Sequence, residues 1–362
     1  MMVKILFAAT SVGFLGSGFG GGAELTLYNI ATALQRRGYE VEVMAAAGSK
    51  LPDIPVIEIE GNVQISAQTQ DRNTPIILPP NSLLANMWEY ARSQQNRYDL
   101  IFNLAYDWLP IYLTPFFQCP VAHIIVMSSI SQFMDEAVIK LAHEYPLQVA
   151  FYTHAQIETF GLKNVRLLSN AIDVEAYSFS PTAKNQLAWV SRISPEKGLE
   201  DAIAAAQQVK MPLKVMGMMQ DPDYWQAICN KYPDVDVEYL GFLSQPALQE
   251  ALGSCKGMLM TQKWVEAFGK VVIEALACGV PVIAYRRGGP AEIIQDGKTG
   301  FLIEPDSIPD LVAKIPRLDE INRQTCRLQA EDEFSLTAMG DRVERWIQDI
   351  LSVRGKNQSK FN

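Results

Sequence analysis

The first half of the chain alternates short apolar runs with amphipathic stretches. Val3 to Ala9 is an apolar run of strand length, and Glu24 to Arg37 repeats apolar residues at helical spacing. Gly38 ends this predicted helix, and Tyr39 to Ala46 is again strand-like. A strand, a helix and a second strand in this order indicate a parallel sheet. Four further strands are predicted in this half, at 56–59, 100–104, 121–126 and 149–152.

A second alternation follows the polar, proline-containing stretch from Ser178 to Asn185. Predicted helices at 198–209 and 245–252 separate strand-like runs at 187–190, 213–216, 235–240, 257–261 and 281–285. The pattern therefore predicts two doubly wound α/β domains, residues 1–170 and 171–337. The last helical stretch, Leu336 to Val353, has one apolar face, and we expect it to pack back on the first domain over about residues 338–355.

Composition narrows the class of protein. The chain has 362 residues, of which 48% are hydrophobic and 20% charged, which suits two globular domains with a ligand site in the cleft between them. The net charge of -9 argues against nucleic acid or an anionic membrane as the main partner. Five dispersed cysteines without a C-x-x-C pair predict neither disulfides nor a zinc site, and favour the cytoplasm. No apolar run reaches the length of a transmembrane helix.

The segment with the most candidate ligand-binding groups begins at Glu266 and runs into a predicted helix that ends at Gly279. Free backbone N–H groups at the start of this helix could hold a diphosphate. Glu274 stands about one turn into the helix, so one of the two carboxylates could face a ribose and the other a sugar. The N–H groups in question belong to Phe268, Gly269, Lys270 and Val271.

Glu266 and Glu274 match the E-x7-E signature of the retaining glycosyltransferases of family 4, which nearly the whole chain resembles. Further motifs stand in the order of that family: N-A-I-D at 170–173, S-R-I-S-P-E-K-G-L at 191–199, L-G-F at 240–242 and G-G-P-A-E-I-I at 288–294. The resemblance implies the GT-B fold, in which two Rossmann-like domains face each other across a cleft. It also implies an N-terminal acceptor domain and a C-terminal domain for a nucleotide-sugar donor.

The same resemblance implies roles in the donor half. Arg192 and Lys197 would neutralise the donor diphosphate, which gains negative charge as the glycosidic bond breaks. Glu274 would hold the ribose hydroxyls, and Glu266 would contact the donor sugar. Retention is explained in the family by front-face attack, with a phosphate oxygen of the donor assisting deprotonation of the acceptor. The nucleobase of the donor is expected near Gly241, Phe242 and Leu243.

The Gly-rich loop from Gly16 to Gly22 contains G-x-G-x-x-G, so an NAD-dependent oxidoreductase is an alternative of another class. The loop is longer than a dinucleotide loop, however, and no acid closes the second strand, which ends in M-A-A-A at 44–47. In the resembled family the corresponding loop reaches toward the donor. Gly21 and Gly22 are therefore expected to allow close approach of the backbone.

Acceptor residues are expected at the carboxyl ends of strands in the first domain. Asp107 is the candidate to orient an acceptor hydroxyl. Packing beneath the loops is the alternative interpretation for the aromatic candidates. Val126 stands where many relatives carry a histidine, and His123 is either a core or a functional residue. The remaining candidates to line an acceptor pocket are Phe14, Phe19, Tyr106, Trp108 and Met127.

Residues 11–27 and 126–131 resemble a subgroup of the family that glucosylates reduced pterins such as tetrahydrobiopterin. This implies transfer of glucose from UDP-glucose to a hydroxyl of a small soluble acceptor. The alternatives are transfer to a cell-envelope polysaccharide or lipid-linked sugar, an NAD-dependent oxidoreductase, and a non-catalytic protein that binds nucleotide sugars. Asp234 and Asp236 form a D-x-D, but a charged strand entry explains it, and neither an essential metal nor another cofactor is expected.

Overall fold

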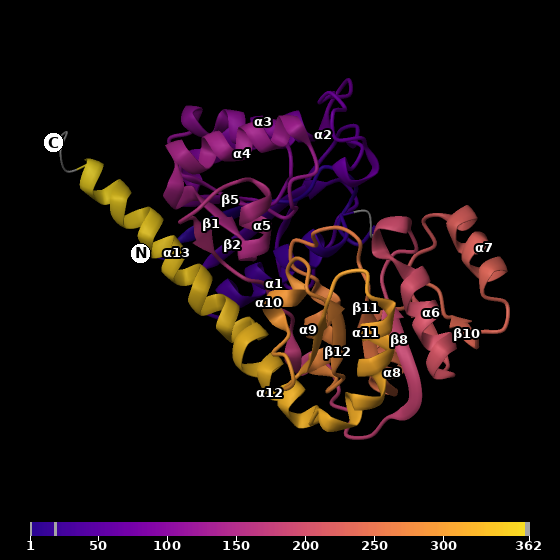
Figure 1. Cartoon of the computed structure of the whole chain (residues 1–362). Helices are drawn as coiled ribbons and strands as arrows, with labels where there is room; N and C mark the ends of the chain where they lie inside the picture. The colour runs from indigo at the N-terminus through magenta and orange to yellow at the C-terminus, as the bar shows by residue number, and fades with distance from the viewer. Residues whose placement is uncertain (1, 18–19, 359–362) are drawn as a thin grey trace. The chain divides into compact units, whose positions relative to one another are not determined.

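The computed structural model describes residues 2–17 and 20–358, and within this part the chain divides into two units. Unit 1 consists of residues up to Ala171 and from Leu336 onward, and unit 2 runs from Ile172 to Ser335. Each unit is a parallel sheet covered by helices (Figure 1). The predicted α/β class with two doubly wound domains is confirmed.

In the described part of unit 1, seven parallel strands follow the order β3-β2-β1-β4-β5-β6-β7. The direction of winding reverses between β1 and β4, and ligands of such sheets bind where the carboxyl ends of the strands diverge. The central strands are apolar because helices cover both faces of the sheet. The strands are β1 Lys4–Ala8, β2 Glu40–Ala46, β3 Val56–Ile59, β4 Leu100–Asn103, β5 Val121–Ile124, β6 Val149–Phe151 and β7 Arg166–Leu167.

Helices of unit 1 come from both ends of the chain. The long helix α13 packs against α1, and Trp346 of α13 is completely buried with its ring 5.2 Å from Phe102. Arg37 reinforces this contact through Asp341 at 2.7 Å and Glu344 at 2.8 Å. Although α13 follows unit 2 in the sequence, it completes the core of unit 1. The helices are α1 Gly22–Gln35, α2 Leu83–Gln94, α3 Trp108–Leu113, α4 Gln132–Glu144, α5 His154–Thr159 and α13 Leu336–Gln358.

The described strands of unit 2 repeat this topology in the order β10-β9-β8-β11-β12-β13. The edge strand β13 was not predicted from the sequence, because it is short and opens on a glycine that packs tightly against β12. The strands are β8 Lys184–Val190, β9 Leu213–Met216, β10 Val237–Tyr239, β11 Cys255–Met260, β12 Val282–Tyr285 and β13 Gly300–Ile303. The helices are α6 Leu199–Val209, α7 Pro222–Lys231, α8 Gln245–Gly253, α9 Lys270–Ala277, α10 Pro290–Ile293, α11 Ile308–Lys314 and α12 Arg323–Phe334.

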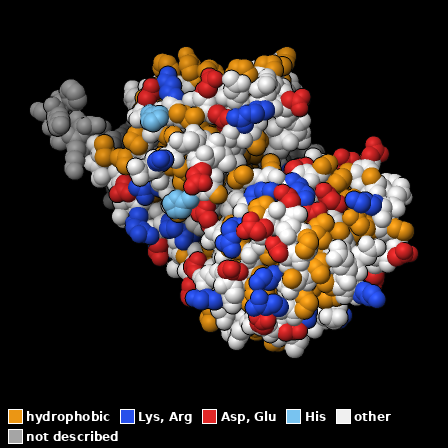
Figure 2. All heavy atoms as spheres, viewed as in Figure 1, with side chains coloured by type: hydrophobic (Ala, Val, Ile, Leu, Met, Phe, Trp, Pro, Cys, Tyr) orange, Lys and Arg blue, Asp and Glu red, His pale blue; other side chains and the backbone are white. Residues whose placement is uncertain are grey.

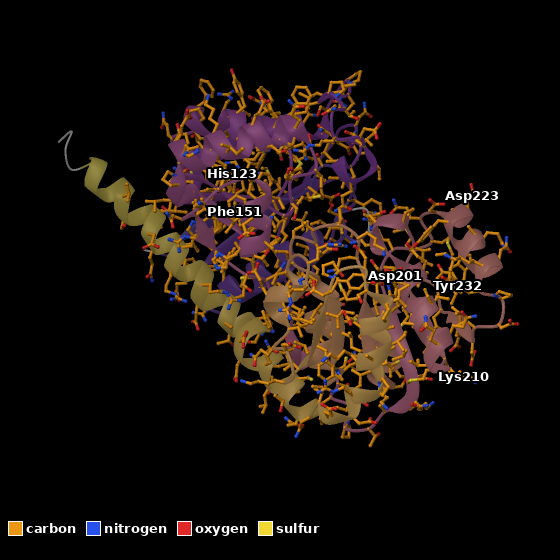
Figure 3. The ribbon with its side chains drawn as sticks, in the orientation of Figure 1. His123, Phe151, Asp201, Lys210, Asp223 and Tyr232 are labelled. Carbon is orange, nitrogen blue, oxygen red and sulfur yellow. The ribbon has the colours of Figure 1, made fainter. Side chains whose placement is uncertain are left out.

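His123, labelled in Figure 3, lies in β5 with no exposed surface. Its Nδ1 is 3.1 Å from the Asn103 amide nitrogen, and its Nε2 is 2.8 Å from the Thr114 hydroxyl. Burial lowers the pKa of His123 to about 3, so the ring is neutral. Of the two interpretations of this residue, the structure supports the core histidine.

The described helices include none with an apolar stretch of bilayer length. Hydrophobic side chains do gather on the surface of unit 1 over α3 and α4 (Figure 2). The largest exposed side chains there are Trp108, Tyr112, Phe116 and Phe133.

Candidate functional site

The loops that follow β8 and β11 meet at the carboxyl edge of the unit 2 sheet, because these strands are neighbours. Lys197 lies in the first loop and Glu266 in the second, and Lys197 Nζ is 2.5 Å from Glu266 Oε2. Only 10% of the Lys197 side chain and 19% of the Glu266 side chain are exposed. The structure thus brings together two residues that the sequence identified as catalytic candidates.

Trp264 completes this pair. Its Nε1 donates a hydrogen bond of 3.1 Å to Glu266 Oε2, and its ring centroid lies 4.4 Å from Lys197 Nζ, within cation–π range. Burial opposes ionisation of Glu266, but the charge and hydrogen bonds around it prevail and hold its pKa below the usual range. The hydrogen bonds from Lys197 and Trp264 both use Oε2, so these two residues leave Oε1 able to accept a ligand hydroxyl.

Arg192 adds a second cation to the loop after β8. Its guanidinium contacts Gln220 and lies 3.5 Å from Glu196, while the Ser194 hydroxyl donates to the same Glu196 oxygen at 2.7 Å. Arg192 also helps to lower the pKa of Glu266. The loop after β8 therefore presents two positive charges toward one carboxylate.

Helix α9 begins at Lys270, directly after this cluster. Gly269 precedes it with a φ of 91°, a conformation that suits glycine, and no side chain of a described residue caps the helix at this position. Phe268 is buried, with its ring 6.1 Å from Phe334. The first turn of α9 therefore has the geometry of an anion-binding helix start, formed by residues 268–271.

Lys270 is the first residue of α9, and Glu274 follows it by one turn. Glu274 is buried and accepts a hydrogen bond of 3.3 Å from the Tyr177 hydroxyl. Burial raises the pKa of Glu274 and lowers the pKa of Lys270 to about 7, while the attraction between the two charges acts in the opposite direction. A bound anion would favour the charged form of Lys270.

Two glycines after β12 support the loop that carries Glu266. Gly289 donates a backbone hydrogen bond of 2.8 Å to the Glu266 carbonyl. A Cβ at Gly289 would lie 2.4 Å from the Phe268 carbonyl oxygen, and one at Gly288 would lie 2.7 Å from the Glu266 backbone. The close approach of two backbones thus explains the glycine pair of the G-G-P-A-E motif.

A second network lies beneath the same loops, and the sequence analysis missed it. Asp201, labelled in Figure 3, accepts hydrogen bonds from Lys263 and the Tyr285 hydroxyl. Asp306 joins it through Lys263 at 3.1 Å and Arg287 at 2.6 Å. The sequence feature that could have predicted this network is that its residues lie within a few positions of the ends of strands, or of the start of a helix, in the same predicted domain. The network fixes the loops after β11, β12 and β13 relative to α6.

The other predicted donor residues of unit 2 follow β10. Gly241 has a φ of 74°, and its carbonyl accepts a hydrogen bond of 2.8 Å from the Gly217 N–H. Leu243 is half-buried, whereas Phe242 is 76% exposed. The segment thus offers an exposed ring at the carboxyl edge. Asp234 and Asp236 instead precede β10, at the amino end of that strand.

In unit 1, the Gly-rich loop leads into α1. Gly21 precedes the helix with a φ of 53°, and Gly22 is its first residue. The Glu24 carboxylate accepts backbone hydrogen bonds from Gly16 at 2.9 Å and Gly20 at 2.7 Å. The loop amides that a dinucleotide phosphate would use are thus partly engaged by Glu24, which the sequence analysis missed. Phe19 lies outside the described residues.

The predicted acceptor candidates of unit 1 have different surroundings. Asp107 precedes α3 and accepts hydrogen bonds from Ser11 at 3.3 Å and Gln64 at 3.0 Å. Burial raises the pKa of Asp107 to about 6, and these two uncharged partners lower it only in part. The carboxylate is therefore held close to its titration point near neutral pH.

The described aromatic candidates divide into exposed and half-buried side chains. Trp108 and Phe14 are exposed, and Trp108 stacks on Tyr112 with ring centroids 4.5 Å apart. Tyr106 packs against an apolar cluster of unit 1, in line with the alternative interpretation of packing beneath the loop. Met127 is half-buried, and its Sδ accepts a hydrogen bond of 3.2 Å from Gln68.

Residues 174–331 match the model of the family described as glycosyl transferases group 1. The match covers most of unit 2, which is therefore similar to this family. The matched range contains the Lys197–Glu266 pair, the start of α9 and the glycines that support them. The motifs predicted a resemblance to glycosyltransferases, and this match supports it for the unit that holds the predicted donor residues.

Two curated relatives share the glycosyl transferases group 1 region. The chain is 30% identical over 189 residues to the sulfoquinovosyl transferase SQD2 of Arabidopsis thaliana, covering 47% of this chain and 36% of that protein. It is also 30% identical over 171 residues to the uncharacterized glycosyltransferase MJ1178 of Methanocaldococcus jannaschii, covering 46% of each. The aligned part thus spans less than half of either relative.

Solved structures extend the likeness over nearly the whole chain. HepE of Anabaena, in complex with UDP and glucose, has a TM-score of 0.76 at 22% identity and covers 96% of this chain and 100% of its own. Sucrose-phosphate synthase of Thermosynechococcus elongatus has a TM-score of 0.74 at 16% identity, covering 97% and 100%. The predicted GT-B fold is confirmed.

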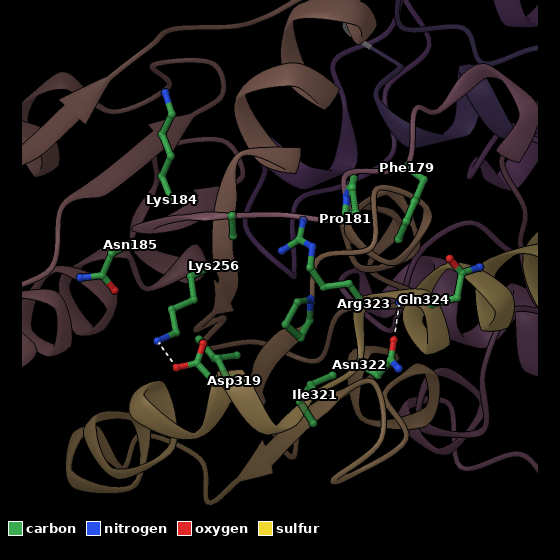
Figure 4. A pocket seen from close by; sticks show the side chains of 13 residues that line it. Phe179, Pro181, Lys184, Asn185, Lys256, Asp319, Ile321, Asn322, Arg323 and Gln324 are labelled. Atoms are coloured by element: carbon green, nitrogen blue, oxygen red, sulfur yellow. Dashed lines mark hydrogen bonds and ion pairs between the residues drawn. The ribbon is translucent and has the colours of Figure 1, made fainter.

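A cavity of about 640 Å³ lies at the opposite, amino-terminal edge of the unit 2 sheet (Figure 4). Arg323 donates there to the carbonyls of Ser180, Gly253 and Cys255, and Lys256 pairs with Asp319 at 2.8 Å. These cations are engaged by the protein itself. The cavity is therefore separate from the candidate site.

Proposed function

We propose that the protein is a retaining glycosyltransferase that moves glucose from UDP-glucose to a hydroxyl of a small acceptor. The observation that carries the proposal is the buried Lys197–Glu266 pair beside the start of α9, within the range that matches the glycosyl transferases group 1 family. It combines a cation for a diphosphate, a carboxylate for a sugar hydroxyl and a helix start for phosphate oxygens. Each of these groups could help to bind the donor or to stabilise the charge that develops when its glycosyl phosphate bond breaks.

In the proposed reaction, the bond between C1 of glucose and the diphosphate oxygen breaks, and the electron pair leaves with UDP. Arg192 and Lys197 would stabilise the charge that develops on the diphosphate. Lys197 would exchange part of its contact with Glu266 for a phosphate oxygen, since an ammonium group has three donors. Glu266 would then bind a glucose hydroxyl through Oε1, and Glu274 would bind the ribose.

The acceptor oxygen would form the new bond to C1 on the face that the diphosphate leaves, which retains the configuration. Its proton would pass to a phosphate oxygen of the departing UDP. No second carboxylate is needed as a nucleophile, in contrast to a retaining glycosidase. The choice of UDP-glucose is supported by HepE, a protein of similar fold with a structure in complex with UDP-glucose.

A reduced pterin is the acceptor that we propose. Its flat ring suits the exposed, stacked pair of Trp108 and Tyr112, and its side-chain hydroxyl suits orientation by Asp107. Tetrahydrobiopterin is the appropriate probe because it presents both features. These residues belong to unit 1, whereas the proposed donor residues belong to unit 2.

The proposal is tested by titrating the protein with UDP-glucose, GDP-glucose, ADP-glucose and NADH. UDP-glucose is expected to raise the free energy of unfolding by RT ln(1 + [L]/Kd), or about 2.7 kcal/mol at a hundredfold excess over Kd, and therefore to raise the melting temperature most. Tetrahydrobiopterin is then added and the glucoside is sought by mass spectrometry. No response to any nucleotide sugar, or a response to NADH alone, would contradict the proposal. Binding without transfer to any acceptor would indicate a nucleotide-sugar sensor.

Substituting Gly289 by Ala is expected to displace the loop that carries Glu266. Because the new Cβ would overlap the Phe268 carbonyl, the 266–269 loop must shift, at a cost of about 1–3 kcal/mol in stability. We expect the affinity for UDP to fall at least about tenfold, which corresponds to about 1.4 kcal/mol. Calorimetry of UDP binding and thermal unfolding measure both effects. Gly253→Ala is the control, since the three atoms nearest to its Cβ would be side-chain atoms of Ser180 and Cys278, at 3.3 Å or more.

A further inference from the structure

A long connection between β3 and α2 crosses the carboxyl edge of the unit 1 sheet. Its base is closed by backbone hydrogen bonds from Asn62 to the Asn81 carbonyl at 2.8 Å and from Leu83 to the Asn62 carbonyl at 2.9 Å. We call residues 62–81 the strap. The strap contains one short 3₁₀ helix, Ala67–Thr69. Connections of this length in compact domains usually serve a function.

The strap is attached to the ends of several strands. The Gln64 N–H donates to the Ser11 carbonyl after β1 at 2.9 Å, and the Gln68 amide donates to Met127 after β5 at 3.2 Å. Arg72 donates to the Ser129 hydroxyl at 2.9 Å and also pairs with Asp135 of α4. The strap therefore lies over the strand ends where the acceptor candidates are found.

Gln64 has the most specific position in the strap. Its amide nitrogen donates to Asp107 Oδ1 at 3.0 Å, while Ser11 donates to Oδ2 at 3.3 Å. Only the NH₂ group can donate to a carboxylate, so the orientation of the amide is fixed. Gln64 Oε1 is then buried, and it has no hydrogen-bond partner among the described residues.

An unpartnered buried oxygen is costly, about 1–3 kcal/mol, and native structures rarely leave one without a reason. Ser128, next to Met127 at the end of β5, has a buried hydroxyl that also finds no hydrogen-bond partner among the described residues. Both orphan groups belong to the edge that the strap covers. They indicate a ligand that brings its own hydrogen-bond donors to this edge.

We propose that Gln64 is the positioning residue of the acceptor site, holding Asp107 through its NH₂ group and accepting an N–H or O–H of the acceptor through Oε1. The strap is then the element that selects acceptors with such a donor close to the reacting hydroxyl. This inference rests on the proposed function. A reduced pterin, whose ring carries several N–H groups, belongs to this chemical class.

Gln64→Leu removes both hydrogen bonds while keeping most of the side-chain volume. The KM for tetrahydrobiopterin is expected to rise, and transfer at low pterin to fall, by about tenfold to a hundredfold. The KM for UDP-glucose should change less than twofold, because the donor residues belong to the other unit. Gln64→Asn, which keeps both polar groups on a shorter chain, should recover part of the loss. A role in folding alone would lower the melting temperature without separating the two KM values.

Gln70→Leu is the matched control, because the Gln70 side chain makes no hydrogen bond to another described residue of the strap or the sheet. Binding of tetrahydrobiopterin is also measured by calorimetry without UDP-glucose. Equal pterin affinity in Gln64→Leu and Gln70→Leu would overturn the role of Gln64. Lost pterin binding in Gln64→Leu alone would support it even if the wild-type protein failed to turn over UDP-glucose, a result that would overturn the proposed function instead.

Discussion

Lys197→Met is expected to lower kcat/KM for UDP-glucose by about a thousandfold, the upper range for removing one preorganised donor from a developing oxyanion. The substitution removes the more buried cation of the site and keeps a similar chain length. Arg192, the other cation of the loop after β8, already contacts Gln220 and Glu196 and cannot replace it. Steady-state kinetics with tetrahydrobiopterin in excess measure this change.

The same substitution also has a structural cost. Glu266 would keep the Trp264 hydrogen bond but lose its ion pair, so its pKa should rise toward neutrality. Leaving such a group underpartnered costs about 1–3 kcal/mol, which is small beside the catalytic effect. Lys256→Met is the control, because Lys256 pairs with Asp319 at the other edge of the sheet. Similar losses of activity in both variants would show that Lys197 has no special role.

Asp107→Asn should lower transfer to the acceptor by about a hundredfold, the scale of loss expected when a reacting hydroxyl is no longer correctly oriented. Hydrolysis of UDP-glucose in the absence of acceptor should be unchanged. The substitution keeps the shape of the side chain but removes its charge and replaces one of its two acceptor oxygens, which bind Ser11 and Gln64, by an NH₂ donor. Parallel assays of transfer and hydrolysis separate the two effects, with the exposed Asp71→Asn as control.

The pKa of about 6 at Asp107 gives this prediction a pH dependence. Wild-type transfer should rise as the pH increases through about 6, because the carboxylate replaces the carboxylic acid. The pKa of Asp107 is higher in the folded than in the unfolded state. Its contribution to the free energy of unfolding therefore falls as the pH rises from about 4 to above 6. Asp107→Asn should therefore abolish the acidic limb of the pH profile and leave the melting temperature at pH 7.5 equal or higher. An unchanged acidic limb would contradict the role of Asp107.

The fold could be predicted because buried parallel strands appear as continuous apolar runs. Leu187 to Val190 and Val3 to Ala9 are such runs, each followed by a predicted helix, and the structure places β8 and β1 there. Short edge strands lack this signal. β7 has two residues and β13 begins with a glycine, so tertiary contacts rather than local sequence determine these strands.

The site was predictable to the extent that it follows strand ends. Lys197 and Glu266 follow neighbouring strands, and that rule places them on one edge even though 69 residues separate them. The rule does not say which groups touch. The Trp264 ring beneath Lys197 and the Gly289 backbone against Phe268 depend on loop conformations that have no periodic pattern.

The strap could not be found from the sequence for the same reason. Gln64 is a polar residue in a non-periodic stretch, and nothing in its neighbourhood indicates that it reaches Asp107, 43 positions away. His123 illustrates the opposite case. Its apolar strand indicated burial, but only the Asn103 and Thr114 contacts distinguish a satisfied core imidazole from a functional one.

The packing of α13 determines the order in which the protein can fold during synthesis. Unit 2 is one continuous stretch, so its core is complete once the ribosome has released residue 335. The sheet of unit 1, made first, must wait for Trp346 to cover Phe102. Nascent chains of multidomain proteins usually fold from the N-terminus, but here the later unit can reach its native state first. Until α13 has been synthesised, the nascent chain exposes an apolar surface of unit 1 that chaperones can bind.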